Sequence, residues 1–279
     1  MNLRPIAEKV ERGERLTRED GLALFASHDL LTIGRLADLA NVRKNGERVY
    51  FAANQHINPT NVCILRNTCV FCSFARMPKE DGAYTRSLDE VFAEADAARD
   101  NPTREFHIVG GLHPKLRLAY YVDMFRGLKA RHPQVMIKAL TAVEVAHLAR
   151  IEGMSTRDVL QAMKDAGVST LPGGGAEVFS PAARATIADR KLSGEEWLAV
   201  HREAHQLGMP SNCTMLYGHV ETMAGAPRNQ GAPQGAPRPQ GGRKTGQNDG
   251  EFVVELPRRV DDHQTAAPKR PFQWGLADA

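Results

Sequence analysis

The chain has 279 residues, a hydrophobic share of 42% and a net charge of +3 at neutral pH. This length and composition suit one large globular domain or two small ones. Nucleic-acid binding usually requires a clustered basic surface, so the small net charge predicts no nucleic-acid partner.

Residues 1–48 are predicted to form a helical N-terminal preface. Apolar residues recur at loose helical spacing, and the segment Thr17–Asp20 is typical of a capped helix start. We expect this preface to pack against one end of the main domain. The first residues lack the apolar stretch of a secretory signal, and no later apolar run is long enough to span a membrane. With clustered cysteines, this predicts a cytoplasmic protein without a membrane partner.

Residues 49–222 follow a repeated order of strand, loop and helix. The expected strands are Tyr50–Ile57, Phe106–Gly111, Val135–Leu140, a segment that ends in Gly173–Gly175, and Asn212–Tyr217. The expected helices cover 87–95, 119–131, 143–151, 155–166 and 195–207. This alternation indicates an α/β fold with a parallel sheet and outer helices, and the unit length fits a (β/α) barrel.

Three of the four cysteines, Cys63, Cys69 and Cys72, lie within ten residues after the first expected strand. Thiolates clustered in one loop are more often metal ligands than disulfide partners. A structural zinc site closes with four protein ligands, whereas an iron–sulfur cube held by three cysteines leaves one iron open. We therefore expect a three-cysteine iron–sulfur site. There are two alternatives: the cysteines could form a zinc site that includes His56, or they could bind no metal. The fourth cysteine, Cys213, is expected to be a small buried apolar residue.

Polar and glycine residues follow the other expected strands, and parallel barrels place ligand groups at these carboxyl ends. Thr141 and Glu144 are expected to contact a substrate. The backbone N–H groups of Gly173 and Gly174 could hold a ribose or a carboxylate, and Glu177 could bind sugar hydroxyls. A flexible glycine loop without a ligand is the alternative.

Two further sets of side chains could bind a substrate. Lys138 lies in an apolar strand and is a candidate partner for a carboxylate, as is Arg76, although both could equally be solvated. His219 and Glu221 share one face of an extended segment. They could transfer a proton or bind a carboxylate, or they could form a structural pair.

The cysteine loop, with Phe71 directly before Cys72, resembles the cluster loop of radical S-adenosylmethionine (SAM) enzymes. Longer stretches are similar to the aminofutalosine synthase family within that superfamily. These stretches are His56–Thr60, Cys72–Arg76, Gly110–Pro114, Ile137–Glu144, Leu171–Phe179 and Thr214–Thr222. The resemblance covers about residues 20–222. The cysteine spacing differs from that of the superfamily, which is usually C-x3-C-x2-C. This chain has C-x5-C-x2-C, which adds two residues to the loop without removing a ligand.

The resemblance implies a partial (β/α) barrel of the radical SAM type and two cofactors. These are a [4Fe–4S] cluster on the three cysteines, and SAM, which is consumed as a co-substrate. The family's methionine-binding segment corresponds to Gly110, Gly111 and His113, which are therefore expected near the cofactor. Phe71 is expected beside the adenine, with a core position as the alternative.

The resemblance also implies an activity. The family adds the 5′-deoxyadenosyl radical of SAM to 3-[(1-carboxyvinyl)oxy]benzoate, an aromatic enol-ether carboxylate, and forms aminofutalosine and CO2 in menaquinone biosynthesis. An electron donor such as flavodoxin or ferredoxin is the expected protein partner. The alternatives are a related enzyme such as dehypoxanthine futalosine cyclase, or a non-catalytic, truncated metal-binding fragment.

Residues 223–279 differ in composition from the rest of the chain. Glycine and proline dominate the first part, which predicts a disordered C-terminal tail with order-prone islands at Phe252–Leu256 and Phe272–Trp274. Five expected strands leave the barrel incomplete. We therefore hypothesise that a frameshift or gene-model error replaced the family's C-terminal part, which resequencing the DNA around codon 222 would test.

Overall fold

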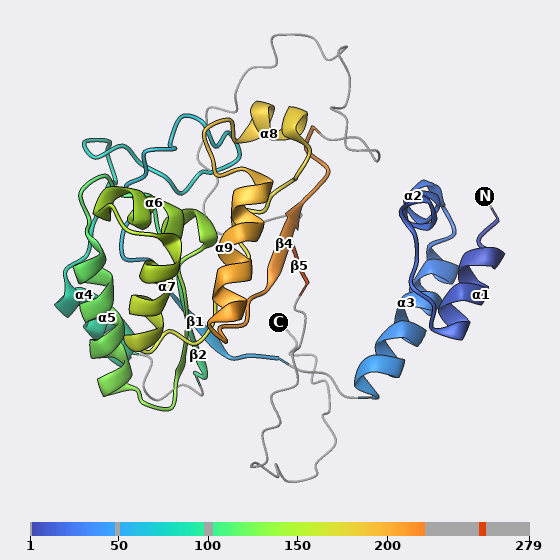
Figure 1. Cartoon of the computed structure of the whole chain (residues 1–279), viewed down its shortest axis with the longest axis horizontal. Helices are drawn as coiled ribbons and strands as arrows, with labels where there is room; N and C mark the ends of the chain where they lie inside the picture. The colour runs from blue at the N-terminus through green and yellow to red at the C-terminus, as the bar shows by residue number, and fades with distance from the viewer. Residues whose placement is uncertain (1, 48–50, 98–102, 221–250, 255–279) are drawn as a thin grey trace, which may run out of the picture.

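The computed structural model describes residues 2–47, 51–97, 103–220 and 251–254 (Figure 1). Its N-terminal part holds the helices α1 (Arg4–Arg12), α2 (Arg18–Ala26) and α3 (Leu30–Asn45). The predicted start of α2 is confirmed, because the Thr17 side chain accepts from the backbone N–H of Asp20 and the Asp20 carboxylate accepts from that of Thr17. This reciprocal pair satisfies two backbone donors that a helix start would leave unpaired.

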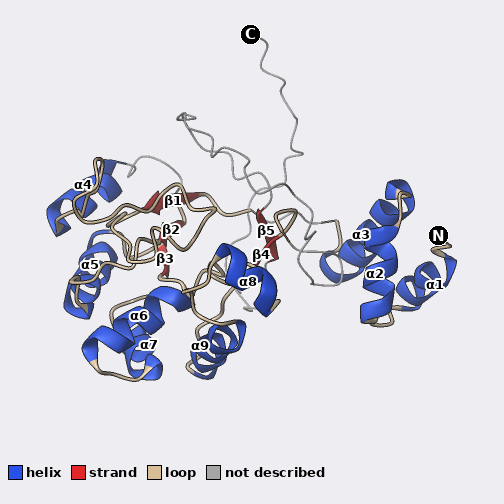
Figure 2. Ribbon diagram, turned by 90° about the horizontal axis from the view of Figure 1, so that it is seen from above, coloured by secondary structure: helices blue, strands red, loops and turns tan. Residues whose placement is uncertain are grey.

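These three helices lie apart from the rest of the described molecule in both views (Figures 1 and 2). The expectation that they pack against one end of the main domain is therefore wrong. Their own contacts hold them together: Lys9 forms an ion pair with Asp20, and the guanidinium of Arg43 donates to the backbone carbonyl of Val10. Leu30 and Leu31 of α3 are 74% and 89% exposed, so this apolar surface is uncovered.

The main body is organised by a parallel sheet in the order β1 (Asn54–Ile57), β2 (Glu105–Ile108) and β3 (Met136–Ala139). Beyond β3, the parallel arrangement continues only through single bridges, from Lys138 to Thr170 and from Leu171 to Ser211. The prediction of a regular fourth strand is therefore wrong, because only these isolated bridges connect the segment to its neighbours.

The last predicted strand of the barrel forms β4 (Cys213–Leu216), which pairs antiparallel with β5 (Glu251–Val254). The strand β5 coincides with one of the two islands expected to be order-prone. The remainder of the predicted tail lies outside the described residues, apart from this segment.

Helices cover the outer side of the strands in an arc (Figure 2). They are α4 (Leu88–Ala97), α5 (Leu118–Arg131), α6 (Ala142–Glu152), α7 (Thr156–Asp165) and α9 (Gly194–Gln206), with the unpredicted α8 (Pro181–Ile187) near the end of α9. Thr141, Ser155 and Ser193 cap α6, α7 and α9 through their side-chain oxygens. Among the described helices, none has the length and apolar character needed to cross a membrane.

The alternation of side chains along the strands separates the core from the inner face of the sheet. Phe106, Ile108 and Ile137 are at most 1% exposed and belong to the same apolar cluster as Phe125 and Leu128 of α5. Residues of the opposite parity on β2 and β3 point to the inner face. The outward-facing residues thus supply the stability of the fold, and the inward-facing residues are available for binding.

A buried histidine on α9 connects this core to a glycine segment. The ring of His201 lies 3.8 Å from that of Trp197, whose indole N–H donates to the backbone carbonyl of Gly174. Neither ring nitrogen of His201 has a hydrogen-bond partner in the described part of the chain. Burial lowers the pKa of His201 to about 4, so the folded state favours the neutral ring.

Stability should therefore fall as the pH decreases from about 6.5 to about 4, because the unfolded chain gains a proton that folded His201 does not take. The full effect is on the order of 3 kcal/mol. Denaturant unfolding at pH 7 and at pH 4.5 measures it. We expect His201→Phe to flatten this pH dependence and His28→Gln, at an exposed position before α3, to leave it unchanged. An unaltered slope in His201→Phe would contradict this assignment.

Candidate metal centre and cofactor cavity

A cavity of about 640 Å³ opens inside the sheet near the carboxyl ends of its strands. Its volume falls within the range typical of ligand-binding pockets. The segments that line it come from far apart in the sequence: the cysteine loop, Gly110–Leu112, Thr141–Glu144 and Pro172–Gly175. The parallel fold therefore brings most of the predicted strand-end residues to one cavity.

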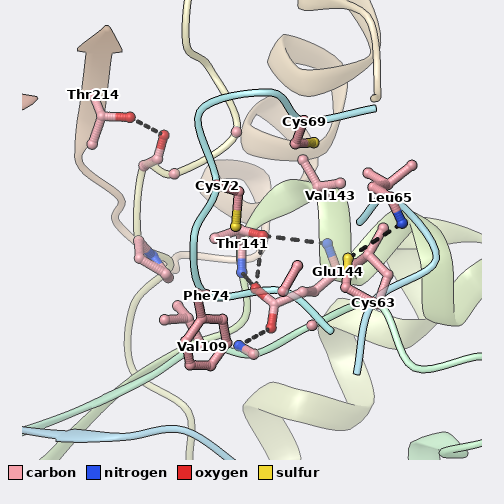
Figure 3. Close-up of a pocket in the computed structure, with 18 of the residues that line it drawn as sticks. Cys63, Leu65, Cys69, Cys72, Phe74, Val109, Thr141, Val143, Glu144 and Thr214 are labelled. Atoms are coloured by element: carbon pink, nitrogen blue, oxygen red, sulfur yellow. Dashed lines mark hydrogen bonds between the residues drawn. The ribbon is translucent and has the colours of Figure 1, made fainter. Parts of the chain in front are cut away.

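All three clustered cysteines line this cavity, and their sulfurs lie around one space beside Val143 (Figure 3). None of the chain's four cysteines forms a disulfide. Cys63 and Cys69 are buried, Cys72 is half-buried, and Cys213 is half-buried away from the other three. The expectation of a buried Cys213 is therefore met only in part.

Tight turns absorb the unusual length of the cysteine loop. The backbone N–H of Thr68 and that of Cys69 both donate to the carbonyl of Leu65, at 2.9 and 3.0 Å. The backbone N–H of Leu65 in turn donates to the sulfur of Cys63 at 3.4 Å. The two additional residues thus fold back on themselves, and all three thiols remain on the cavity.

The same loop is fixed to its surroundings through its backbone. The N–H of Cys63 donates to the carbonyl of Arg76, that of Ile64 donates to Leu112, and that of Val70 donates to Ile187. The Arg76 guanidinium donates to the carbonyls of nearby loop residues and does not line the cavity. Arg76 thus supports the loop in this structure.

The chemistry of the thiols fits a metal cluster. Burial raises the pKa of Cys63 and that of Cys69, although backbone N–H groups oppose this at Cys63 and the Lys191 ammonium opposes it at Cys69. Thiols in such an environment need a bound metal to be held as thiolates. In the described ranges, no three His, Cys, Asp or Glu side chains converge as a single-ion site requires. The three cysteine sulfurs border one shared space (Figure 3).

Two glycine positions allow backbone segments to meet at the cavity. A Cβ atom on Gly111 would lie 2.2 Å from the carbonyl oxygen of Val62, and one on Gly173 would lie 2.6 Å from that of Asn212. Glycine is required at such close approaches because it has no Cβ. The Gly173 segment is held further by Thr214, whose hydroxyl donates to the carbonyl of Gly173 (Figure 3).

The carboxylate of Glu144 connects the end of β2 to the start of α6. It accepts from the backbone N–H of Gly110 at 2.8 Å and from both the N–H and the hydroxyl of Thr141 at 2.7 Å (Figure 3). Burial raises the pKa of Glu144 to about 7, although these donors favour the charged form. Thr141 and Glu144 both line the cavity, and they also fix Gly110 in place.

An ion pair that the sequence analysis did not foresee lies beside the cysteines. Lys191 pairs with Glu177, and its ammonium lies 5.4 Å from the centre of the Phe71 ring. All three residues line the cavity. The Glu177 loop is supported by buried Arg184 of α8, which donates to the carbonyl of Ala176 at 2.6 Å. Lys191 follows an exposed turn in an unpredicted region, so no sequence pattern identified it.

Besides Arg76, three predicted site residues do not line the cavity or cannot be placed. The Nδ1 atom of His113 accepts from the backbone N–H groups of Lys115 and Leu116, which fixes the ring in its own loop. His219 is exposed after β4 and does not line the cavity. Glu221 lies outside the described residues.

A deeper part of the cavity wall holds polar residues that the sequence analysis did not expect to bind a substrate, apart from Lys138. These are Asn54, His56 and His107, which lie next to Lys138 in the lining. The ammonium of Lys138 is 3.3 Å from the carboxylate of buried Glu105. Lys138 therefore points into the barrel, as its role as a carboxylate partner requires.

Comparison with known families places this cavity in context. The family described as "Radical SAM superfamily" matches residues 57–225. Aminodeoxyfutalosine synthase from Thermus thermophilus is 46% identical over 78% of this chain and 58% of its own length. The enzyme of the same name from Streptomyces coelicolor is 47% identical over 78% of this chain and 56% of its own. The chain thus spans just over half the length of these relatives.

A more distant relative and two solved structures also match. The 5-amino-6-(D-ribitylamino)uracil–L-tyrosine 4-hydroxyphenyl transferase of Methanopyrus kandleri is 39% identical over 73% of this chain and 56% of its own length. Methylornithine synthase (PylB) superimposes with a TM-score of 0.57 at 18% identity, over 74% of this chain and 57% of its own. HydG, a maturase of the [FeFe]-hydrogenase, superimposes with a TM-score of 0.58 at 18% identity, over 78% of this chain and 47% of its own. These two structures share the fold.

Replacing Gly111 with alanine should destabilise the protein because the new Cβ would overlap the carbonyl of Val62. We expect a loss of at least about 2 kcal/mol, as for other overpacked sites. Gly34→Ala is the matched control: its Cβ meets nothing within 4 Å on helix α3, so it should be neutral or slightly stabilising. Thermal unfolding measures both, and equal melting temperatures for the two variants would contradict the close approach.

Proposed function

The chain belongs to the radical SAM superfamily, and we propose that it adds the 5′-deoxyadenosyl radical of SAM to 3-[(1-carboxyvinyl)oxy]benzoate, forming aminofutalosine and CO2. The observation that carries this proposal is the position of Cys63, Cys69 and Cys72 on the same cavity as the glycine segments. The 46–47% identity to enzymes named aminodeoxyfutalosine synthase supports the choice of reaction within the superfamily.

Two parts of the cavity would hold the cofactors. The three thiolates would hold a [4Fe–4S] cluster and leave one iron for the methionine end of SAM. When bound, this cluster supplies the electron that cleaves SAM into methionine and the 5′-deoxyadenosyl radical. Gly110 and Gly111 border the cavity with backbone alone, which leaves room for the amino end of the methionine. Phe71, between two of the cysteines, offers an aromatic face for the adenine.

Other residues would hold the ribose and keep the cavity electrically balanced. Glu177 could accept hydrogen bonds from the ribose hydroxyls while Lys191 compensates its charge. Lys138 compensates Glu105 in the same way deeper in the barrel. Compensated charges can be desolvated at lower cost, and a cavity that excludes water protects a radical from side reactions. A one-electron donor such as flavodoxin or ferredoxin would complete the system.

A second candidate is transfer of an aryl group rather than an adenosyl group. The 39% identity to a 4-hydroxyphenyl transferase favours it over other reactions of the superfamily. Mass spectrometry of the products distinguishes the two: our proposal requires an adenosyl adduct of the enol ether, with the carboxylate lost as CO2. Release of free 5′-deoxyadenosine without an adduct would contradict adenosyl addition.

The cluster assignment predicts which cysteines bind iron. After anaerobic reconstitution, we expect Cys63→Ala, Cys69→Ala and Cys72→Ala each to lose most of the bound iron and the [4Fe–4S]⁺ signal in electron paramagnetic resonance. Cys213→Ala is the matched control and should keep both, because its thiol does not line the cavity. In the parent protein, the signal should change when SAM is added. Full iron content in all three loop variants would contradict the assignment.

A further inference from the structure

Three polar side chains form a row across the inner face of the sheet. The parallel register aligns His56 with His107, and His107 with Lys138. All three line the cavity. Gly110 lies three residues beyond His107 toward the mouth, and a strand rises about 3.3 Å per residue, so the row is roughly 10 Å deeper than the glycine segment.

A buried carboxylate organises this row from one residue layer below. Glu105 is 2% exposed, and its two oxygens lie 3.3 Å from the Lys138 ammonium and 3.8 Å from Nδ1 of His107. The rings of His56 and His107 are stacked with centroids 4.6 Å apart and an interplanar angle of 17°. The row thus places two imidazole rings and an ammonium group on the cavity, and the carboxylate lies beneath them.

The fold itself does not need this row. The interior of a parallel barrel is usually filled by branched apolar side chains, and here Phe106 and Ile137 on the outer face supply the buried core. Placing a charged pair and two imidazoles on the inner face costs desolvation free energy that apolar residues would avoid. The row therefore makes this face of the cavity more polar than packing alone requires, as suits a polar ligand.

We propose that the row His56–His107–Lys138 binds a carboxylate of the substrate, at the end of the cavity away from the cysteines. A carboxylate only accepts hydrogen bonds, and the Lys138 ammonium and the N–H group of an imidazole can donate them. This assignment rests on the proposed function, which requires a substrate with a carboxylate at each end, and it identifies His107, oriented by Glu105, as a substrate-binding residue.

The methionine carboxylate of SAM is the other possible source of an anion in this cavity. The depth of the row argues against it, since that carboxylate would lie beside the cluster at the mouth. Binding measurements on the reconstituted holoenzyme separate the two sources. Benzoate tests the carboxylate, benzamide is its neutral analogue of the same shape, and S-adenosylhomocysteine tests the cofactor site.

The main variant is Glu105→Gln/Lys138→Met, which removes both charges and so leaves no buried charge unpaired. His107→Asn provides a second, smaller change, and Lys164→Met on the surface of α7 is the matched control. By calorimetry, we expect the first two variants to bind benzoate about 10- to 100-fold more weakly, as expected for the loss of a hydrogen bond to a charged group. Benzamide and S-adenosylhomocysteine should bind all variants within about twofold of the parent protein.

Three results would overturn the proposal: equal affinity of the parent protein for benzoate and benzamide, no binding of benzoate at all, or a parallel loss of S-adenosylhomocysteine binding in the variants. Failure of the proposed function looks different. In that case the adenosyl adduct would not form, while the parent protein would still prefer benzoate to benzamide and the variants would not.

Discussion

The close contact between the end of β2 and the cysteine loop is the constraint on which the site depends. Gly111 lies against the carbonyl of Val62, the residue before Cys63, and its backbone N–H donates to the carbonyl of Thr60. The next connection runs from Gly110 through the Glu144 carboxylate to the start of α6. The position of the thiols is therefore set by backbone contacts that tolerate no side chain, and the helix layer transmits its rigidity to the loop through one buried carboxylate.

Local sequence patterns predicted most of the helices. They failed where the structure depends on pairing between segments that lie far apart in the sequence. The cap predicted at Thr17 acts on a residue three positions away, so the sequence alone identifies it. The fourth strand was wrong because whether a short apolar segment forms a regular ladder depends on its neighbours in the sheet. The helix α8 was missed because it is short.

The candidate site shows the same division. The clustering of the cysteines on one cavity was predictable from residue type and spacing, whereas Gly110 and Gly111 were expected there from the family resemblance. The alignment of His107 with Lys138 could not be predicted, because the two residues are 31 positions apart and only the parallel register brings them side by side. Likewise, the pairing of Lys191 with Glu177 depends on the path of the loop around α8. His113 was expected near the cofactor, but its ring nitrogen caps its own loop, a contact for which the sequence gives no signal.

The folding of the cysteine loop has a consequence for how such proteins are found. The turns at Leu65 take up two residues while the sulfurs still border one cavity. The loop therefore accommodates the longer interval between the first two cysteines without moving a thiol away from the cavity. Genome searches that demand a fixed interval between these cysteines would pass over chains of this kind. A search based on the glycine pair and the buried glutamate would detect them, because those residues are fixed by contacts that an insertion in the loop does not alter.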